Sequence, residues 1–189
     1  KALTTAQIST LTAAQIALME TTDIAALTAA QAEKLTTQAV AALTTDQIKA
    51  LSSAALNALT SDQIKAIEAE DVTAMTTEQV KNLSTTQVTR LTTEQMEALT
   101  TTQVQALTTL QVSVLTSLQI NKLASDDLQA LLTSQIRALT SEQINNISTE
   151  QISNLSTSQV AALSTAQTSA LTSSQIENMT SDQLGALNF

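Results

Sequence analysis

The stretch that decides the fold is LTTDQIKA at residues 43–50, with its near copy LTSDQIKA at residues 59–66. The same eight-residue unit, here called an octad, runs without insertion or deletion from Leu3 to Ala186, which makes 23 copies. Position 1 is Leu in 18 octads, position 2 is Thr or Ser in 19, and position 5 is Gln in 18. Position 6 is aliphatic in every octad except the one that carries Thr168. Such regularity predicts one solenoid domain over residues 1–189.

One continuous helix cannot carry this pattern. Eight residues at 100° each leave a stripe that drifts about 80° per octad, so Leu would soon face every direction. The octad contains its own helix start, because Thr or Ser at position 2 and Gln three residues later form a capping box. The aliphatic residues at positions 1 and 6 then form a hydrophobic staple. We therefore predict an all-α solenoid with one capped helix of about six residues per octad.

The positions of the charged residues also agree with one short helix in each octad. Of the 17 acidic residues, 14 lie at positions 2, 4 or 5, and every basic residue except Lys1 lies at position 7 or 8. Acids in the first turn and bases in the last turn complement the helix dipole. The spacing also predicts i,i+3 ion pairs, such as Asp46 with Lys49 and Asp62 with Lys65.

Two other structures compete with the helical one. A β-solenoid suits Thr, Ile and Val, but positions 1 and 6 would point to opposite faces of a strand. The chain also has one Gly and no Pro for turns. Disorder suits the Ser, Thr and Gln content, but it needs no fixed aliphatic register.

A six-residue helix is unstable alone in water, so neighbouring octads must stack. We expect positions 1 and 6 to bury, often joined by Ala at position 8, as in Leu43, Ile48 and Ala50. Lys recurs in every second octad as Lys49, Lys65 and Lys81, which hints at two octads per turn.

Composition excludes several classes of function. Cys and His are absent, which removes disulfides, thiolate metal sites and the commonest catalytic base. A net charge of −9 argues against nucleic-acid binding. No apolar run reaches the roughly 20 residues of a membrane span. We expect no catalytic, cofactor-binding or metal-binding residue, and no enzyme activity.

Three irregular acidic spots are candidates for calcium sites: Glu20 with Asp23, Glu68 with Glu70 and Asp71, and Asp126 with Asp127. None has the ligand spacing of a calcium loop. Displaced helix N-caps explain them better.

Four asparagines precede a Thr or Ser by two residues, in the N-x-S/T pattern: Asn82, Asn146, Asn154 and Asn178. All occupy position 8, so helix C-capping explains them better than glycosylation. The Thr and Ser columns offer a further alternative, a binding surface for protein, glycan or ice.

The unit L-[ST]-[ST]-x-Q-[IV]-x-A, as in LTTDQIKA, resembles octapeptide repeats of very large bacterial surface or secreted proteins. Those proteins are often called adhesin-like or "heme utilization or adhesion" proteins. The resemblance covers essentially the whole chain and implies an extracellular spacer or stalk. It transfers no binding residue, and the absence of His and Tyr gives no support for heme ligation.

The two ends of the chain depart from the repeat. Residues 187–189 follow the last octad, and we predict that Phe189 closes the C-terminal end. Lys1 and Ala2 occupy positions 7 and 8 of a truncated octad. We expect that further repeats of a parent chain precede Lys1, or that this end packs against another copy to build a filament.

Overall fold

The structure, a computed structural model, describes residues 3–188. It contains 23 short α-helices and no strand within that span, and each octad supplies one helix of four to six residues. The helical prediction is confirmed, and the β-solenoid alternative is wrong. Lys1, Ala2 and Phe189 lie outside the described residues, so closure of the C-terminal end by Phe189 stays a prediction.

The chain divides into two compact units, Lys1–Ala98 and Leu99–Phe189, which are described separately. The helices of unit 1 are α1 (Thr5–Ile8), α2 (Ala13–Ala17), α3 (Thr21–Ala25), α4 (Ala29–Ala32), α5 (Thr37–Ala41), α6 (Thr45–Ala50), α7 (Ser53–Ala58), α8 (Ser61–Ala66), α9 (Ala69–Ala74), α10 (Thr77–Asn82), α11 (Thr85–Val88) and α12 (Thr93–Glu97). The helices of unit 2 are α13 (Thr101–Ala106), α14 (Thr109–Val114), α15 (Ser117–Lys122), α16 (Ser125–Ala130), α17 (Thr133–Ala138), α18 (Ser141–Asn146), α19 (Thr149–Ser153), α20 (Thr157–Ala161), α21 (Thr165–Thr168), α22 (Ser173–Glu177) and α23 (Ser181–Ala186).

The capping box starts the helices as predicted. In α6, the Thr44 hydroxyl accepts a hydrogen bond from the Gln47 backbone N–H at 3.3 Å, and the Gln47 side-chain oxygen accepts one from the Thr44 backbone N–H at 2.9 Å. The helix ends within six residues because Leu51 and Ser52 are extended, with ψ angles of 127° and 150°. Two extended residues are enough to turn the chain into the next helix.

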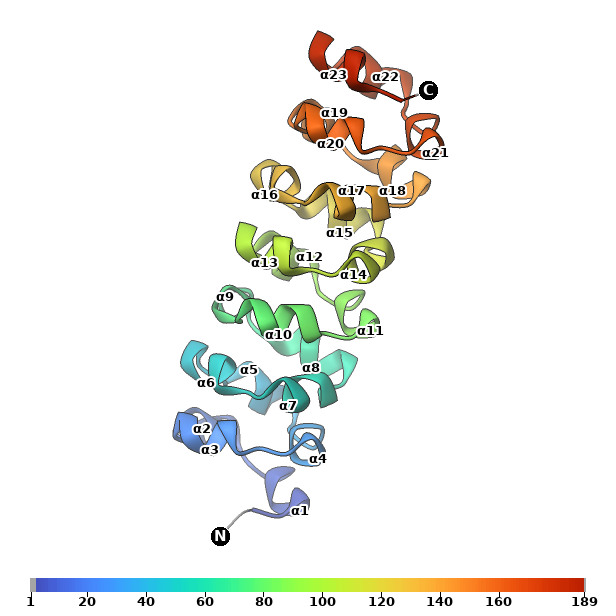
Figure 1. Ribbon diagram of the computed structural model, residues 1–189. Coiled ribbons are helices and arrows are strands. Elements are labelled where there is room, and N and C mark those ends of the chain that lie inside the picture. The colour runs from blue at the N-terminus through green and yellow to red at the C-terminus, as the bar shows by residue number, and fades with distance from the viewer. Residues whose placement is uncertain (1–2, 189) are drawn as a thin grey trace. The chain divides into compact units, whose positions relative to one another are not determined.

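Within each unit, a helix packs against the helix three places further along the chain. In unit 1, α4 contacts α7, α3 contacts α6 and α2 contacts α5; in unit 2, α13 contacts α16 and α14 contacts α17. Figure 1 shows α5, α6 and α7 as a tier beside α2, α3 and α4. A turn therefore comprises three octads. The turn of two octads that the recurrence of Lys suggested is wrong.

The hydrophobic core consists mainly of the side chains predicted to form the hydrophobic staples. Positions 1 and 6 are buried through the interior of both units, as Leu43 and Ile48 illustrate. Ala at position 8, such as Ala50, is only half-buried, so that part of the prediction is wrong. Position 5 takes its place, and Gln47 is 2% exposed. The buried set of an octad is therefore positions 1, 5 and 6.

Thr168 is a polar residue at a core position. It stands at position 6 of α21 and is buried, and its hydroxyl is the one buried side-chain polar atom without a hydrogen-bond partner among residues 3–188. A buried hydroxyl without a partner costs about 1–3 kcal/mol in mutational data. We expect Thr168→Val to raise the free energy of unfolding by about that amount, because Val keeps the shape and removes the hydroxyl.

Urea denaturation followed by circular dichroism measures the effect. Thr165→Val is the matched control, because Thr165 is exposed on the same helix, and its effect should stay within about 0.5 kcal/mol. A destabilised Thr168→Val variant would show that the hydroxyl has a partner.

Candidate functional site: the glutamine clamp

Of the 18 glutamines at position 5, 16 are buried although Gln is a polar residue, and Gln7 and Gln15 are exposed. The buried ones form the most regular polar feature of the described residues. Each ties its own helix to the preceding turn, and we call this arrangement the glutamine clamp. In unit 1 it comprises Gln31, Gln47, Gln63, Gln79, Gln87 and Gln95. In unit 2 it comprises Gln135, Gln143, Gln151, Gln159, Gln167, Gln175 and Gln183.

Gln143 shows the geometry. Its Oε1 accepts a hydrogen bond from the Thr140 backbone N–H at 2.6 Å. Its Nε2 donates to the carbonyl oxygens of Leu115 at 2.6 Å and Val112 at 3.0 Å, which lie 28 and 31 residues earlier. Gln63 repeats the pattern in unit 1, with Leu35 at 2.6 Å and Ala32 at 3.0 Å. The offset places each Gln above the junction between the third and fourth preceding octads.

The two acceptor carbonyls belong to the end of a helix one turn back. Val112 lies in α14 and Leu115 is its C-cap residue. The last carbonyls of a helix lack the usual partner four residues on, and roughly a third to a half of helices satisfy them with a left-handed, usually glycine, cap. In α14 the Val112 carbonyl accepts from the Leu115 N–H at 3.2 Å. The buried Gln143 amide adds a second hydrogen bond to the Val112 carbonyl and bonds the Leu115 carbonyl. One side chain thus completes the start of its own helix and the end of another.

Sequence reasoning found half of this role. The capping box was predicted and is present, but the burial of Gln and its bonds to the preceding turn were missed. One signal was available, because Glu serves a capping box as well as Gln does, yet no octad has Glu at position 5. A carboxylate accepts but cannot donate, so the absence of Glu marks a required donor.

Five octads lack Gln at position 5 and carry Asp23, Ala39, Ala55, Asp71 or Asp127. The three octads with Asp also lack Thr or Ser at position 2, and their N-cap residues make no side-chain cap hydrogen bond. Their helices nevertheless begin at position 3 like the others. The prediction of displaced N-caps at these acidic spots is therefore wrong.

The comparison with protein families shows that the chain is a repeat region. A family model described as the ALTTAQ repeat matches residues 16–53, 40–67, 64–101, 120–157 and 154–188, which together cover more than half of the chain. The chain belongs to the ALTTAQ repeat family. Residues 2–7 of this chain spell that motif, and its Thr4 and Gln7 form the capping box of α1. No curated protein matches the chain.

Asp71 and Asp127 occupy position 5, where most ALTTAQ octads have Gln, and both are buried. Burial raises the pKa of Asp71 above the ordinary carboxyl value, and Glu68 and Glu70 raise it further. Burial also raises the pKa of Asp127; a hydrogen bond from Thr101 opposes that shift and Asp126 adds to it.

These shifts predict an unusual dependence of stability on pH. In the unfolded chain both carboxyls lose their protons at the ordinary value, whereas in the folded chain they keep them to a higher pH. The folded chain therefore binds more protons than the unfolded chain in that window, and stability falls as pH rises until both groups are ionised. We expect the urea midpoint to rise on acidification from neutral pH toward the ordinary carboxyl range.

The variant Asp71→Asn with Asp127→Asn removes both titrations, so its midpoint should depend less on pH than that of the unmodified chain. Asp62→Asn with Asp182→Asn is the control, because both residues are exposed. An unchanged pH dependence in the first variant would contradict the assignment.

Most acidic residues of unit 1 belong to one series of ALTTAQ octads whose helices contact one another. Of its 11 acidic residues, eight lie in the octads of α3, α6, α9 and α12, which also hold the base Lys49. Each of these octads is the third after the one before it, and the helices contact in that order. Within residues 3–188 no group of three or more acidic side chains is arranged to hold a metal ion.

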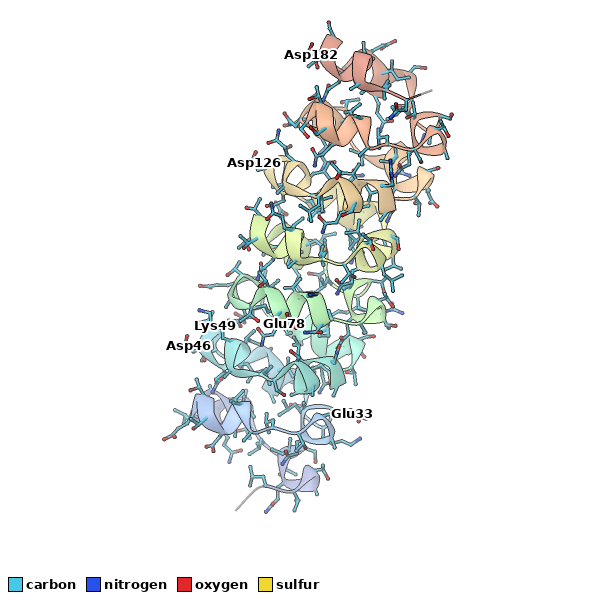
Figure 2. All side chains as sticks on the ribbon, viewed as in Figure 1. Glu33, Asp46, Lys49, Glu78, Asp126 and Asp182 are labelled. Atoms are coloured by element: carbon cyan, nitrogen blue, oxygen red, sulfur yellow. The ribbon has the colours of Figure 1, made fainter. Side chains whose placement is uncertain are left out.

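The predicted i,i+3 ion pairs are not all present. No contact within 4.0 Å joins Asp46 to Lys49 or Asp62 to Lys65 in the described part of the chain. Figure 2 shows Asp46 and Lys49 at the outer edge of the ribbon. Lys34 and Glu33 do form an ion pair, at 3.3 Å.

The position-8 asparagines act at helix ends as predicted. The Nδ2 of Asn82, Asn146 and Asn178 each donates to the carbonyl four residues earlier at 2.8 Å. Asn154 is the C-cap residue of α19. The side chains of Asn82, Asn146 and Asn178 thus bond carbonyls that the clamp does not reach.

Proposed function

We propose that this chain is a structural repeat module, an extracellular spacer or stalk segment of a bacterial surface or secreted protein. The observation that carries the proposal is the glutamine clamp, because the same hydrogen bonds at the same offsets recur from octad to octad. Such a structure changes length by whole octads without changing its contacts. Length is the property that a spacer must provide.

The distribution of exposed residues supports the same role. The consensus side chains at positions 1, 5 and 6 are buried and serve the fold, while positions 3, 4 and 7 face solvent in most octads. We propose no catalytic role for these exposed columns. The resemblance to repeats of bacterial surface proteins supports the extracellular location. None of the helices in residues 3–188 has the length and apolar character to span a bilayer.

Insertion of whole turns tests the proposal. Residues 139–162 comprise three octads, and one or two extra copies placed after Ala162 should each be accommodated as additional helices. Small-angle scattering should show the same increase in maximum dimension for the first and second copies, and circular dichroism should show proportional helix. The control inserts the same three octads with their residues in scrambled order. Unequal increments, or an insertion that adds no helix, would reject the spacer role.

A further inference from the structure

One surface of unit 2, formed by α14, α17 and α20, carries no acidic residue. α17 contacts both α14 and α20, and the three helices follow one another along the unit (Figure 1). Their octads, residues 107–114, 131–138 and 155–162, contain one charged residue, Arg137. We call this surface the acid-free face. The six acidic residues of unit 2 all lie in other octads: Asp126, Asp127, Glu142, Glu150, Glu177 and Asp182.

Two leucines of the acid-free face are exposed and serve neither the core nor a helix cap. Leu110, at position 4 of α14, is 64% exposed, and Leu132, the N-cap residue of α17, is 53% exposed. Leu132 stands where 19 octads have Thr or Ser, and its side chain makes no cap hydrogen bond. A Thr or Ser cap stabilises a helix start. The fold therefore gives up a cap at a position where it exposes an apolar side chain.

A shallow groove lies on the acid-free face between α17 and α20. It is lined by Thr133, Ser134, Arg137 and Ala162. Arg137 Nε donates a hydrogen bond to the Ala162 carbonyl at 3.3 Å, so the guanidinium spans from α17 to α20. The two Nη atoms of Arg137 make no hydrogen bond within residues 3–188. Thr133 and Ser134 are exposed, so donors and hydroxyls stand side by side at the surface.

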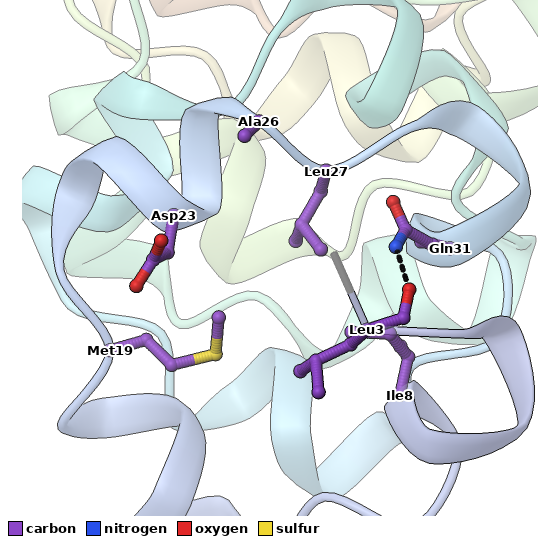
Figure 3. A pocket seen from close by; sticks show the side chains of 7 residues that line it. All are labelled: Leu3, Ile8, Met19, Asp23, Ala26, Leu27 and Gln31. Atoms are coloured by element: carbon purple, nitrogen blue, oxygen red, sulfur yellow. Dashed lines mark hydrogen bonds between the residues drawn. The ribbon is translucent and has the colours of Figure 1, made fainter. Parts of the chain in front are cut away.

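The cavity of unit 1 differs from this groove, because core residues form it. Its walls include Leu3, Ile8 and Leu27 from positions 1 and 6. Figure 3 shows the clamp bond from Gln31 to the Leu3 carbonyl beside them. These side chains belong to the packing and the clamp already described. The residues of the groove in unit 2 have no such part in the fold.

We infer that two copies of this chain dock side by side through their acid-free faces, as an antiparallel dimer with a twofold axis at α17. α17 then lies against α17 of the second copy, and α14 of each copy lies against α20 of the other. Both copies use the same surface in a twofold interface, so that surface must be complementary to itself. The inference goes beyond the proposed spacer role and does not depend on it.

The polar residues of α17 meet this condition. Thr133 and Ser134 begin the helix, and Arg137 lies one turn later, near its end. Antiparallel pairing sets the end of one α17 against the start of the other. Arg137 of each copy therefore reaches the hydroxyls of the other copy. The guanidinium supplies donors and the hydroxyl oxygens accept, and the twofold axis forms the contact twice.

The side chains of α14 and α20 are complementary in size. Leu110 and the half-buried Val114 occupy positions 4 and 8 of their octad, one turn apart on the same side of α14. Ser158 and Ala162 occupy the same positions in the octad of α20. Antiparallel docking sets the large apolar side chains of one copy on the small side chains of the other. Close packing of this kind is typical of the core of an interface.

Charge identifies the occupant as a second copy. The chain has a net charge of −9, so two copies repel each other over most of their surface. On the acid-free face they meet without carboxylates between them. The cores of protein interfaces are depleted of Lys, Glu and Asp and enriched in Arg, which is the composition of this face. A basic partner would need carboxylates opposite its charges, and the face has none.

Sedimentation velocity of the full chain over a range of concentrations tests the proposal, at moderate salt to screen the repulsion. The variant Leu110→Thr with Leu132→Thr removes both exposed leucines. We expect its association constant to fall at least about tenfold. Its melting temperature should stay the same or rise, because the second substitution restores a cap. Leu118→Thr is the matched control, since Leu118 is 62% exposed at position 4 of α15, outside the face. It should associate like the unmodified chain.

Cysteine cross-linking tests the antiparallel arrangement, since the chain contains no Cys. Ser134→Cys places a thiol near the twofold axis, and a short bis-maleimide should link it to a second copy of itself. Thr109→Cys on α14 and Ser158→Cys on α20 should cross-link efficiently only when the two variants are mixed. Far-UV circular dichroism of each variant confirms that it is folded.

Several outcomes would overturn the proposal. The unmodified chain could stay monomeric, the double leucine variant could associate normally, or Leu118→Thr could weaken association as much as that variant does. Cross-linking of Thr109→Cys to itself as efficiently as to Ser158→Cys would exclude the antiparallel dimer. The whole-turn insertion experiment measures length and is independent of these results.

Discussion

Deletion of residues 139–142, half an octad, is expected to abolish the folded structure of unit 2 beyond α17, whereas deletion of the whole octad 139–146 is expected to be tolerated. The clamp offsets give the reason. After the whole-octad deletion, Gln151 stands 28 and 31 residues beyond Leu115 and Val112, which are the acceptors that Gln143 uses. The following octads shift in the same way, so each finds an equivalent partner.

The half-octad deletion gives every later octad a wrong partner. At the clamp offsets Gln143 then meets Gln111 and Thr108, and the Thr108 carbonyl already accepts from the Val112 N–H inside its own helix. Positions 1 and 6 of the next turn also miss the core. A turn holds six such side chains and each contributes about 1.5–3 kcal/mol when buried, so the loss from one turn is comparable with the roughly 5–15 kcal/mol stability of a typical domain.

Circular dichroism and urea denaturation of the two deletions measure this difference. We expect the whole-octad deletion to keep cooperative unfolding and the helix content per octad. The half-octad deletion should lose the helix signal of the octads after α17. Matching unfolding curves for the two deletions would show that the octad is not the structural unit.

Gln143→Glu is expected to cost about 3–5 kcal/mol at neutral pH, the range for a buried charge without a compensating partner. The carboxylate still accepts from the Thr140 N–H but faces the carbonyl oxygens of Val112 and Leu115. Acidification should recover part of the loss, because a protonated carboxyl donates one hydrogen bond.

Gln105→Glu is the matched control, since it makes the same change on an exposed side chain of unit 2. Its effect should stay within about 0.5 kcal/mol in the same urea denaturation assay. A similar loss in both variants would mean that the cost comes from added negative charge and not from the clamp.

The sequence by itself determined the octad, the helix and where each helix begins. Thr44 and Gln47 are three residues apart, and that spacing dictates a capping box through local hydrogen bonds. Leu43 and Ile48 likewise had to be buried, because a helix of six residues has no other source of stability. These features depend on neighbours within one octad, so they can be read from any single copy.

Only the tertiary structure decided which octads meet. Packing of a helix on the third one along, and the clamp to carbonyls 28 and 31 residues earlier, join residues far apart in the chain. Two features of the sequence were weak signs of these contacts. The absence of Glu at position 5 pointed to the clamp, and the acidic residues in every third octad of unit 1 pointed to the packing of every third helix. Because all octads are nearly alike, local patterns cannot tell a neighbour two octads away from one three octads away. The angle through which two extended residues turn the chain sets that distance, and it appears only when the turns close on one another.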